Sequence, residues 1–104
     1  MDEASTRAII DAHAAAVVDP LDVAQIQADL IEDLHPQIPA IAALLPQPVR
    51  EASVDRLDVA ADHAIAELTY RGDAASITIR SRWEDRGAGR PQMVEAAPLG
   101  APAG

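Results

Sequence analysis

The chain has 104 residues, a formal net charge of −9 and no cysteine. This length suits a single domain that buries about two-thirds of its chain surface on folding, and the missing cysteine excludes disulfides and thiolate metal sites. The charge argues against nucleic acid as a partner, because the chain has no lysine and its 8 basic residues are scattered arginines.

The hydropathy of the chain predicts a soluble cytoplasmic protein. The first residues are acidic and lack the basic and apolar segments of a signal peptide. No apolar run approaches the length of a membrane span, so we expect no membrane partner. The sequence has no phosphate loop, dinucleotide fingerprint or nucleophile elbow, and we expect no cofactor.

The first half of the chain shows the three- and four-residue apolar spacing of amphipathic helices. A helix is predicted from about Ser5 to Val18, with Ser5 or Asp2 as its N-cap. A second helix is predicted from Asp19–Pro20 to about Leu34, with Asp19 as its N-cap. The polar residues of this second helix, Asp29 among them, are expected on its outer face.

Prolines are expected to end helices in the last part of this helical half. Pro36 ends the second helix, because the residue before a proline avoids the α region. A short third helix is predicted from about Gln37 to Leu45, and the segment Pro46–Pro48 then leads into the second half of the chain.

The second half, from Val54 to Ala97, alternates apolar and polar residues as half-buried strands do. This alternation predicts four strands in an antiparallel meander with one apolar face. A two-residue turn at Gly72–Asp73 suits a hairpin, because glycine accepts the positive φ of a type II′ turn. With a second turn at Ala61–Asp62 and a looser loop at 86–89, the expected cross-strand pairs are Val59 with Ala64, Leu68 with Ile77, Ser81 with Val94, and Ile79 with Ala96.

The predicted fold is therefore α+β, with two to three N-terminal helices packed on one face of a four-stranded antiparallel meander sheet. We expect one domain over residues 1–97. Residues 98–104 are small and rich in proline and glycine, and they are expected to form a disordered tail.

Helices followed by the meander of residues 54–97 resemble the cone-shaped fold of the nuclear-transport-factor-2-like superfamily, which includes the SnoaL-like proteins. The resemblance is carried by VDRLDVAADHAIAELTYRGDAASITIRSRWEDRGAGRPQMVEAA, in which a strand ending in Arg-Trp-Glu leads through a Gly-Arg turn into a final strand. It implies a helix-backed curved sheet, a small-ligand cavity and a homodimer formed through the sheet. It assigns no catalytic residue.

Three side chains are the candidate ligand-binding residues. His13 lies beside the apolar stripe of the first predicted helix, where it would act as a general base or be a structural histidine. Tyr70 and Trp83 fall on the apolar face of the predicted sheet, where they would frame a pocket or fill the core, and we favour the core.

One spacing is typical of a metal site. Glu32 and His35 have the separation of a helical carboxylate–imidazole pair, but a dinuclear bundle site needs a second such pair, which this sequence lacks. No metal is therefore expected.

Two functions stay open. The first is a non-catalytic homodimeric module that binds a ligand or a partner. The alternative is a small SnoaL-like enzyme (isomerase, cyclase or hydrolase) acting on a small apolar molecule between helices and sheet. A cavity that reaches His13 or Tyr70 would favour the enzyme, and a filled core with a flat outer sheet face would favour the module.

Overall fold

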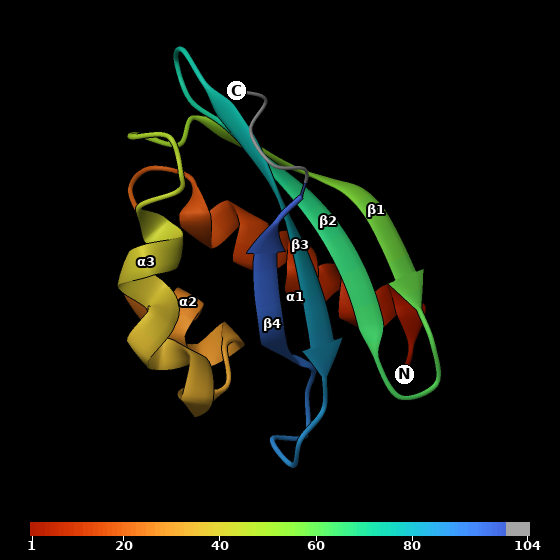
Figure 1. Cartoon of the computed structure of the whole chain (residues 1–104). Helices are drawn as coiled ribbons and strands as arrows, with labels where there is room; N and C mark the ends of the chain where they lie inside the picture. Colours follow the sequence, from red (N-terminus) through yellow and green to blue (C-terminus); the bar gives the residue numbers. More distant parts are fainter. Residues whose placement is uncertain (100–104) are drawn as a thin grey trace.

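The computed structural model describes residues 1–99, in which helices and a sheet form two layers (Figure 1). Each strand is antiparallel to its neighbours, and the strands follow chain order: β1 (Glu51–Val59), β2 (Ala64–Arg71), β3 (Ser76–Glu84) and β4 (Gln92–Pro98). The predicted α+β fold, helices on a four-stranded antiparallel meander, is confirmed. Within these described residues, no helix is long and apolar enough to cross a membrane.

The first helix, α1 (Glu3–Val17), crosses the inner face of the sheet, behind the strands in Figure 1. Of the two predicted caps, Asp2 is the N-cap, and its side chain accepts a hydrogen bond from the Ser5 amide. Ile10 is fully buried and Ala14 nearly so, and the small alanine permits close approach to the strands. The helix therefore packs directly on β1 and β2.

The second helix, α2 (Val23–Asp29), starts later than predicted. Its N-cap is Asp22 and not Asp19, because the Asp22 side chain accepts a hydrogen bond from the Gln25 amide. The 3-10 helix η1 (Glu32–Gln37) and the short helix α3 (Ile38–Ala42) complete this layer. Pro36 lies inside η1, so the prediction that it ends a helix is wrong.

The predicted continuation of α2 to Leu34 is also wrong, because the chain leaves the helix to pair with the sheet. Leu30 forms a parallel bridge with Met93 of β4, and the Ile31 amide donates a hydrogen bond of 3.1 Å to the Met93 carbonyl. Because β4 is an edge strand, this bond satisfies a backbone group that would otherwise face no partner strand.

The hairpin of β1 and β2 has the predicted register, with Val59 opposite Ala64. A bulge at Asp55 shifts the register of the earlier part of β1, where Val54 pairs with Leu68.

The hairpin of β2 and β3 has its turn one residue later than predicted. Leu68 pairs with Ile79 and not with Ile77, and the Gly72 amide donates to the Ala75 carbonyl over 2.8 Å. Gly72 does not have a positive φ. A Cβ at this position would lie 2.6 Å from Pro46 Cβ, so the glycine serves close packing and not a type II′ turn. The register moves by two residues, which keeps every side chain on its predicted face.

The last hairpin also differs from the prediction. Ser81 pairs with Ala96 instead of Val94, and Trp83 pairs with Met93 across a bulge in β4. An extra residue in one strand shifts the facing side chains beyond it. Met93 is therefore buried against the helices.

The core lies between α1 and the inner face of the sheet, which carries Leu68, Ile79 and Trp83. The outer face carries Glu67, Thr69 and Arg80, and all described helices lie on the opposite side (Figure 1). β4 continues to Pro98, one residue beyond the predicted domain, and the Leu99 amide donates to the Thr78 carbonyl. The rest of the predicted tail, residues 100–104, lies outside the described residues.

Candidate functional site

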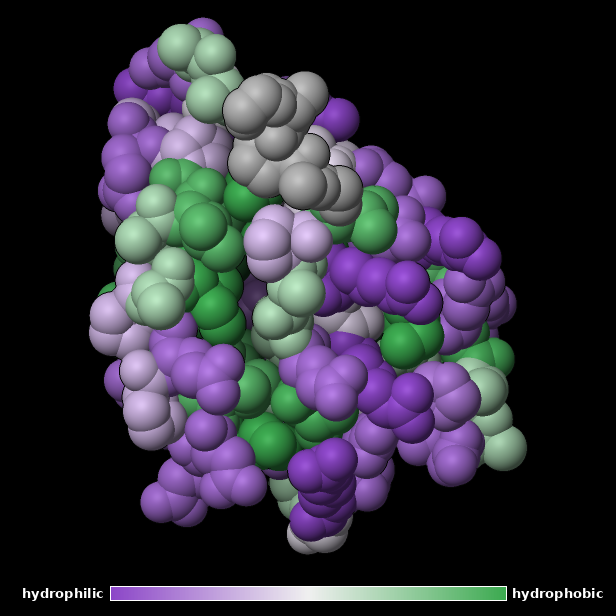
Figure 2. Space-filling view, in the orientation of Figure 1, coloured by the Kyte–Doolittle hydropathy of each residue, from purple (hydrophilic) through white to green (hydrophobic). Residues whose placement is uncertain are grey.

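A cleft of about 300 Å³ separates the α2–α3 layer from β3 and β4. In Figure 2, hydrophobic residues gather around this hollow. The lining is mainly aliphatic, as a core almost without aromatic residues requires. It comprises His13, Val17, Asp19, Leu21, Val23, Ile26, Gln27, Leu30, Ile38, Ile41, Ala42, Leu45, Pro46, Gln47, Pro48, Val49, Tyr70, Ile79, Met93 and Ala96. Two of the three candidate residues, His13 and Tyr70, are thus brought together in one cleft.

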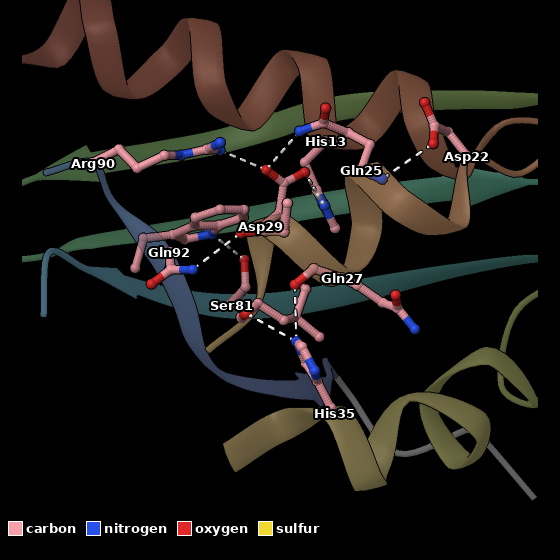
Figure 3. Close-up of polar contacts among 12 residues, drawn as sticks. His13, Asp22, Gln25, Gln27, Asp29, His35, Ser81, Arg90 and Gln92 are labelled. Carbon is pink, nitrogen blue, oxygen red and sulfur yellow. Dashed lines mark hydrogen bonds and ion pairs between the residues drawn. The ribbon is translucent and has the colours of Figure 1, made fainter. Parts of the chain in front are cut away.

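His13 belongs to a buried polar network at one end of the cleft (Figure 3). Its Nδ1 lies 3.0 Å from Oδ2 of Asp29, at the end of α2. The other oxygen of Asp29 accepts hydrogen bonds from Gln25, at 2.9 Å, and from Arg90, at 2.6 Å. Arg90 lies in the loop before β4, so the network joins α1, α2 and the sheet.

The carboxylate of Asp29 is completely buried. Burial alone would raise the pKa of Asp29, but the hydrogen bond and charge of His13 and the hydrogen bonds from Arg90 and Gln25 outweigh it, so the pKa is lowered. Asp29 is therefore ionised at neutral pH, with three donors around it. The prediction that Asp29 lies on the outer face of its helix is wrong.

Trp83, the third candidate, does not line the cleft. It is fully buried behind His13, with ring centroids 5.4 Å apart and an edge-on angle of 76°. Its indole Nε1 donates to the Ser81 hydroxyl over 2.8 Å. This geometry fits the interpretation of Trp83 as a core residue, with its ring edge-on to the imidazole of His13.

Tyr70 lines the cleft from β2, and burial raises the pKa of its phenol, which stays protonated across the physiological range. Of the fully buried side-chain polar atoms in residues 1–99, Thr6 Oγ1 and Arg90 Nε lack a hydrogen-bond partner. The Tyr70 hydroxyl and His13 Nε2 have no hydrogen-bond partner among these residues either. Both residues line the cleft.

The other histidine considered for chemistry, His35, has a structural place. Its Nε2 lies 2.9 Å from the Gln27 carbonyl (Figure 3) and 3.3 Å from that of Leu30, so it donates to carbonyls at the end of α2. Over residues 1–99, no group of three or more histidine, aspartate or glutamate side chains is arranged to hold a metal ion.

Sequence reasoning missed Asp29 and Arg90. The only local signal is the four-residue spacing of Gln25 and Asp29, which places both on one side of α2. Nothing in the sequence links them to Arg90, which lies 61 residues from Asp29. Only the folded sheet brings these residues together.

Searches against protein-family models, curated proteins and solved structures find no match to this chain. The resemblance to the nuclear-transport-factor-2-like superfamily therefore stays a prediction. The function of this chain has to be inferred from the geometry of its cleft and of the polar network beside it.

Proposed function

We propose that this protein binds a small, mainly apolar molecule in the cleft between the α2–α3 layer and the sheet. The observation that carries the proposal is an aliphatic cleft of about 300 Å³ whose lining includes two polar side chains, His13 and Tyr70. This volume is at the small end of the usual range for ligand sites, and such sites typically combine an apolar lining with few polar groups.

The mouth of the cleft supports the same class of ligand. Leu21 and Val23 line it and are 47% and 55% exposed. Side chains of this type gain about 25 cal/mol for each Å² of apolar surface that a ligand removes from water. An apolar molecule would therefore be stabilised both inside the cleft and at its rim.

Neighbouring alanines of β4 offer a matched test. Ala96 lines the cleft, whereas Ala97 is exposed and alternates to the outer face. We expect Ala96→Phe to weaken binding of para-propylphenol, measured by calorimetry, by more than about tenfold, the effect of losing ~1.4 kcal/mol of contact. Ala97→Phe is the control and should bind like the wild type. Equal binding by all three proteins, or none by the wild type, would contradict the proposal.

The pair of His13 and Asp29 favours a second candidate, an enzyme that uses the same cleft. A buried carboxylate that holds an imidazole beside a cavity is an arrangement suited to general base catalysis. We would incubate the protein with butyrophenone in D₂O and follow loss of the proton signal next to the carbonyl by NMR. Exchange that is faster than in buffer and absent in His13→Gln would support catalysis, and exchange at the buffer rate would leave binding alone.

We also propose a homodimer formed through the outer face of the sheet. Support comes from the absence of any helix of residues 1–99 on this face (Figure 1) and from partly buried Ile65 among its polar residues. Light scattering on a size-exclusion column should give twice the chain mass of 10.9 kDa. We expect Ile65→Lys to give a monomer, and a wild-type monomer at high concentration would remove the proposal.

A further inference from the structure

The two carboxylate oxygens of Asp29 have different partners. Oδ1 accepts hydrogen bonds from Gln25 Nε2 and Arg90 Nη2, whereas Oδ2 faces only His13 Nδ1 among residues 1–99 (Figure 3). An ionised carboxylate accepts hydrogen bonds and donates none. The proton in the contact of His13 with Asp29 therefore belongs to Nδ1.

This contact determines what His13 offers to the cleft. In a neutral imidazole one nitrogen carries the proton and the other is an acceptor. With the proton on Nδ1, Nε2 has a free lone pair. The guanidinium of Arg90 also lies 2.6 Å from the carboxylate and supplies a positive charge there.

We infer that the cleft selects ligands whose polar group donates a hydrogen bond, such as a hydroxyl or an N–H, and that Asp29 sets this selectivity through the tautomer of His13. The inference depends on the proposed ligand-binding function and narrows its ligand class. An apolar molecule with only an acceptor, such as an ether or a ketone, would face the lone pair of Nε2 with a lone pair of its own. Asp29 is here a positioning residue, since it touches His13 and not the cleft.

A matched pair of probes tests the selectivity in the full chain. We would compare para-propylphenol with para-propylanisole by calorimetry at about pH 8, where an ordinary imidazole is neutral. The two differ by one methyl group, which replaces the hydroxyl proton. The phenol should bind about five- to tenfold more tightly, the usual effect of one hydrogen bond in a buried site.

The variant Asp29→Asn should reverse this preference. With the amide oxygen in the place of Oδ1, where Gln25 and Arg90 donate, the amide NH₂ takes the place of Oδ2 and donates to His13 Nδ1. The proton of the imidazole then moves to Nε2, which becomes a donor to the cleft. Butyrophenone, which carries only an acceptor, should bind the variant more tightly than the wild type, and the phenol more weakly.

Tyr70 is the necessary control, because this residue lines the same cleft and carries a hydroxyl. If His13 sets the selectivity, Tyr70→Phe keeps the preference for phenol over anisole. The ¹⁵N shifts of His13 in the wild type give a reading that requires no variant and no ligand. They should show a protonated Nδ1 and an unprotonated Nε2.

The other outcomes would contradict either the inferred selectivity or the proposed binding function. Equal binding of phenol and anisole, a phenol preference unchanged in Asp29→Asn, or a wild-type proton on Nε2 would overturn the inference and leave the binding function intact. If no probe binds the wild type while the ¹⁵N shifts show the expected tautomer, the proposed function fails and the geometry of the pair stands.

Discussion

The two halves of the inner sheet face are covered in different ways. Over β1 and β2, α1 packs directly on the strands, and Ile10 and Leu68 are at most 1% exposed. Over β3 and β4, the layer of α2, η1 and α3 lies beside the sheet (Figure 1), and the cleft separates the two (Figure 2). One half is a filled core. In the other half, the layer of α2, η1 and α3, called the roof below, covers an apolar cleft.

The roof is held at its two ends. At one end, the network around Asp29 and the bridge of Leu30 with Met93 fasten α2 to β4. At the other, Pro46 lies so close to Gly72 that no Cβ would fit between them. The comparison teaches that polar and close backbone contacts position this layer, whereas apolar side chains position α1. Substitutions in the two halves should therefore have different costs.

The largest difference is expected between two isoleucines. Ile10 is fully buried under α1, and Ile10→Ala should cost about 4 kcal/mol of unfolding free energy, because it leaves a cavity in a filled core. Ile41 is partly exposed and lines the cleft, so Ile41→Ala should cost about 1 kcal/mol or less. Denaturant unfolding followed by the fluorescence of Trp83 measures both. Equal costs would show that the cleft half is as tightly packed as the α1 half.

The next effect concerns the polar end of the roof. Asp29→Ala removes the acceptor for three donors and leaves Arg90 without its carboxylate, which should cost about 3 kcal/mol. The control is Asp33→Ala, at an exposed position of η1, which should stay within about 0.5 kcal/mol of the wild type. If the two variants unfold at the same denaturant concentration, the network does not hold α2 in place.

The filled half could be predicted from the sequence more fully than the cleft half. Strict alternation in β2 and β3 and the spacing in α1 assign each side chain to a face. In a strand, this assignment stays correct even when the predicted register is wrong by two residues. The β2–β3 turn illustrates this: the position of Gly72 suggested a turn type, while its actual role is contact with Pro46, a residue 26 positions earlier. The observed turn lies one residue later than the predicted one, but Leu68 and Ile79 are both buried, as predicted.

The cleft could not be predicted, because it depends on pairings between segments distant in sequence. α2 ends where Leu30 meets β4, and no local propensity marks that point. Met93 reaches the cleft only through a bulge in β4. His13 and Tyr70 were identified as candidates by residue type and face, but Asp29, with the polar pattern of a solvated helix face, was not.

The close-packed end of the roof gives a smaller effect. In Gly72→Ala, the new Cβ would meet Pro46 Cβ at 2.6 Å and the Pro48 carbonyl oxygen at 3.0 Å, so the variant should lose about 2 kcal/mol through overpacking. Gly89 is the control, because it has φ of +78° but a Cβ added there would meet nothing within 4 Å. Gly89→Ala should cost about 1 kcal/mol through backbone strain alone. A Gly72→Ala variant as stable as the wild type would show that Pro46 can move and does not hold the roof.

The smallest effect is the part of the Asp29 contribution that depends on pH. Because the folded state lowers the pKa of Asp29 below its ordinary 3.8, the ionised form stabilises the fold above that value. This stabilisation is lost as the pH falls from about 3.8 through the folded pKa. The groups that face the carboxylate are His13, Gln25 and Arg90.

Unfolding free energies of the wild type and Asp29→Asn, measured from neutral pH into this acid range, isolate that contribution. The stability gap between the two proteins should be widest near neutral pH and narrow as the carboxylate takes up its proton. Asp33→Asn, on the exposed side of η1, should run parallel to the wild type throughout. A gap that stays constant into acid would mean that the shape of the side chain at position 29, and not its charge, fastens α2 to the sheet. The polar end of the roof would then be held by packing, as the α1 half is.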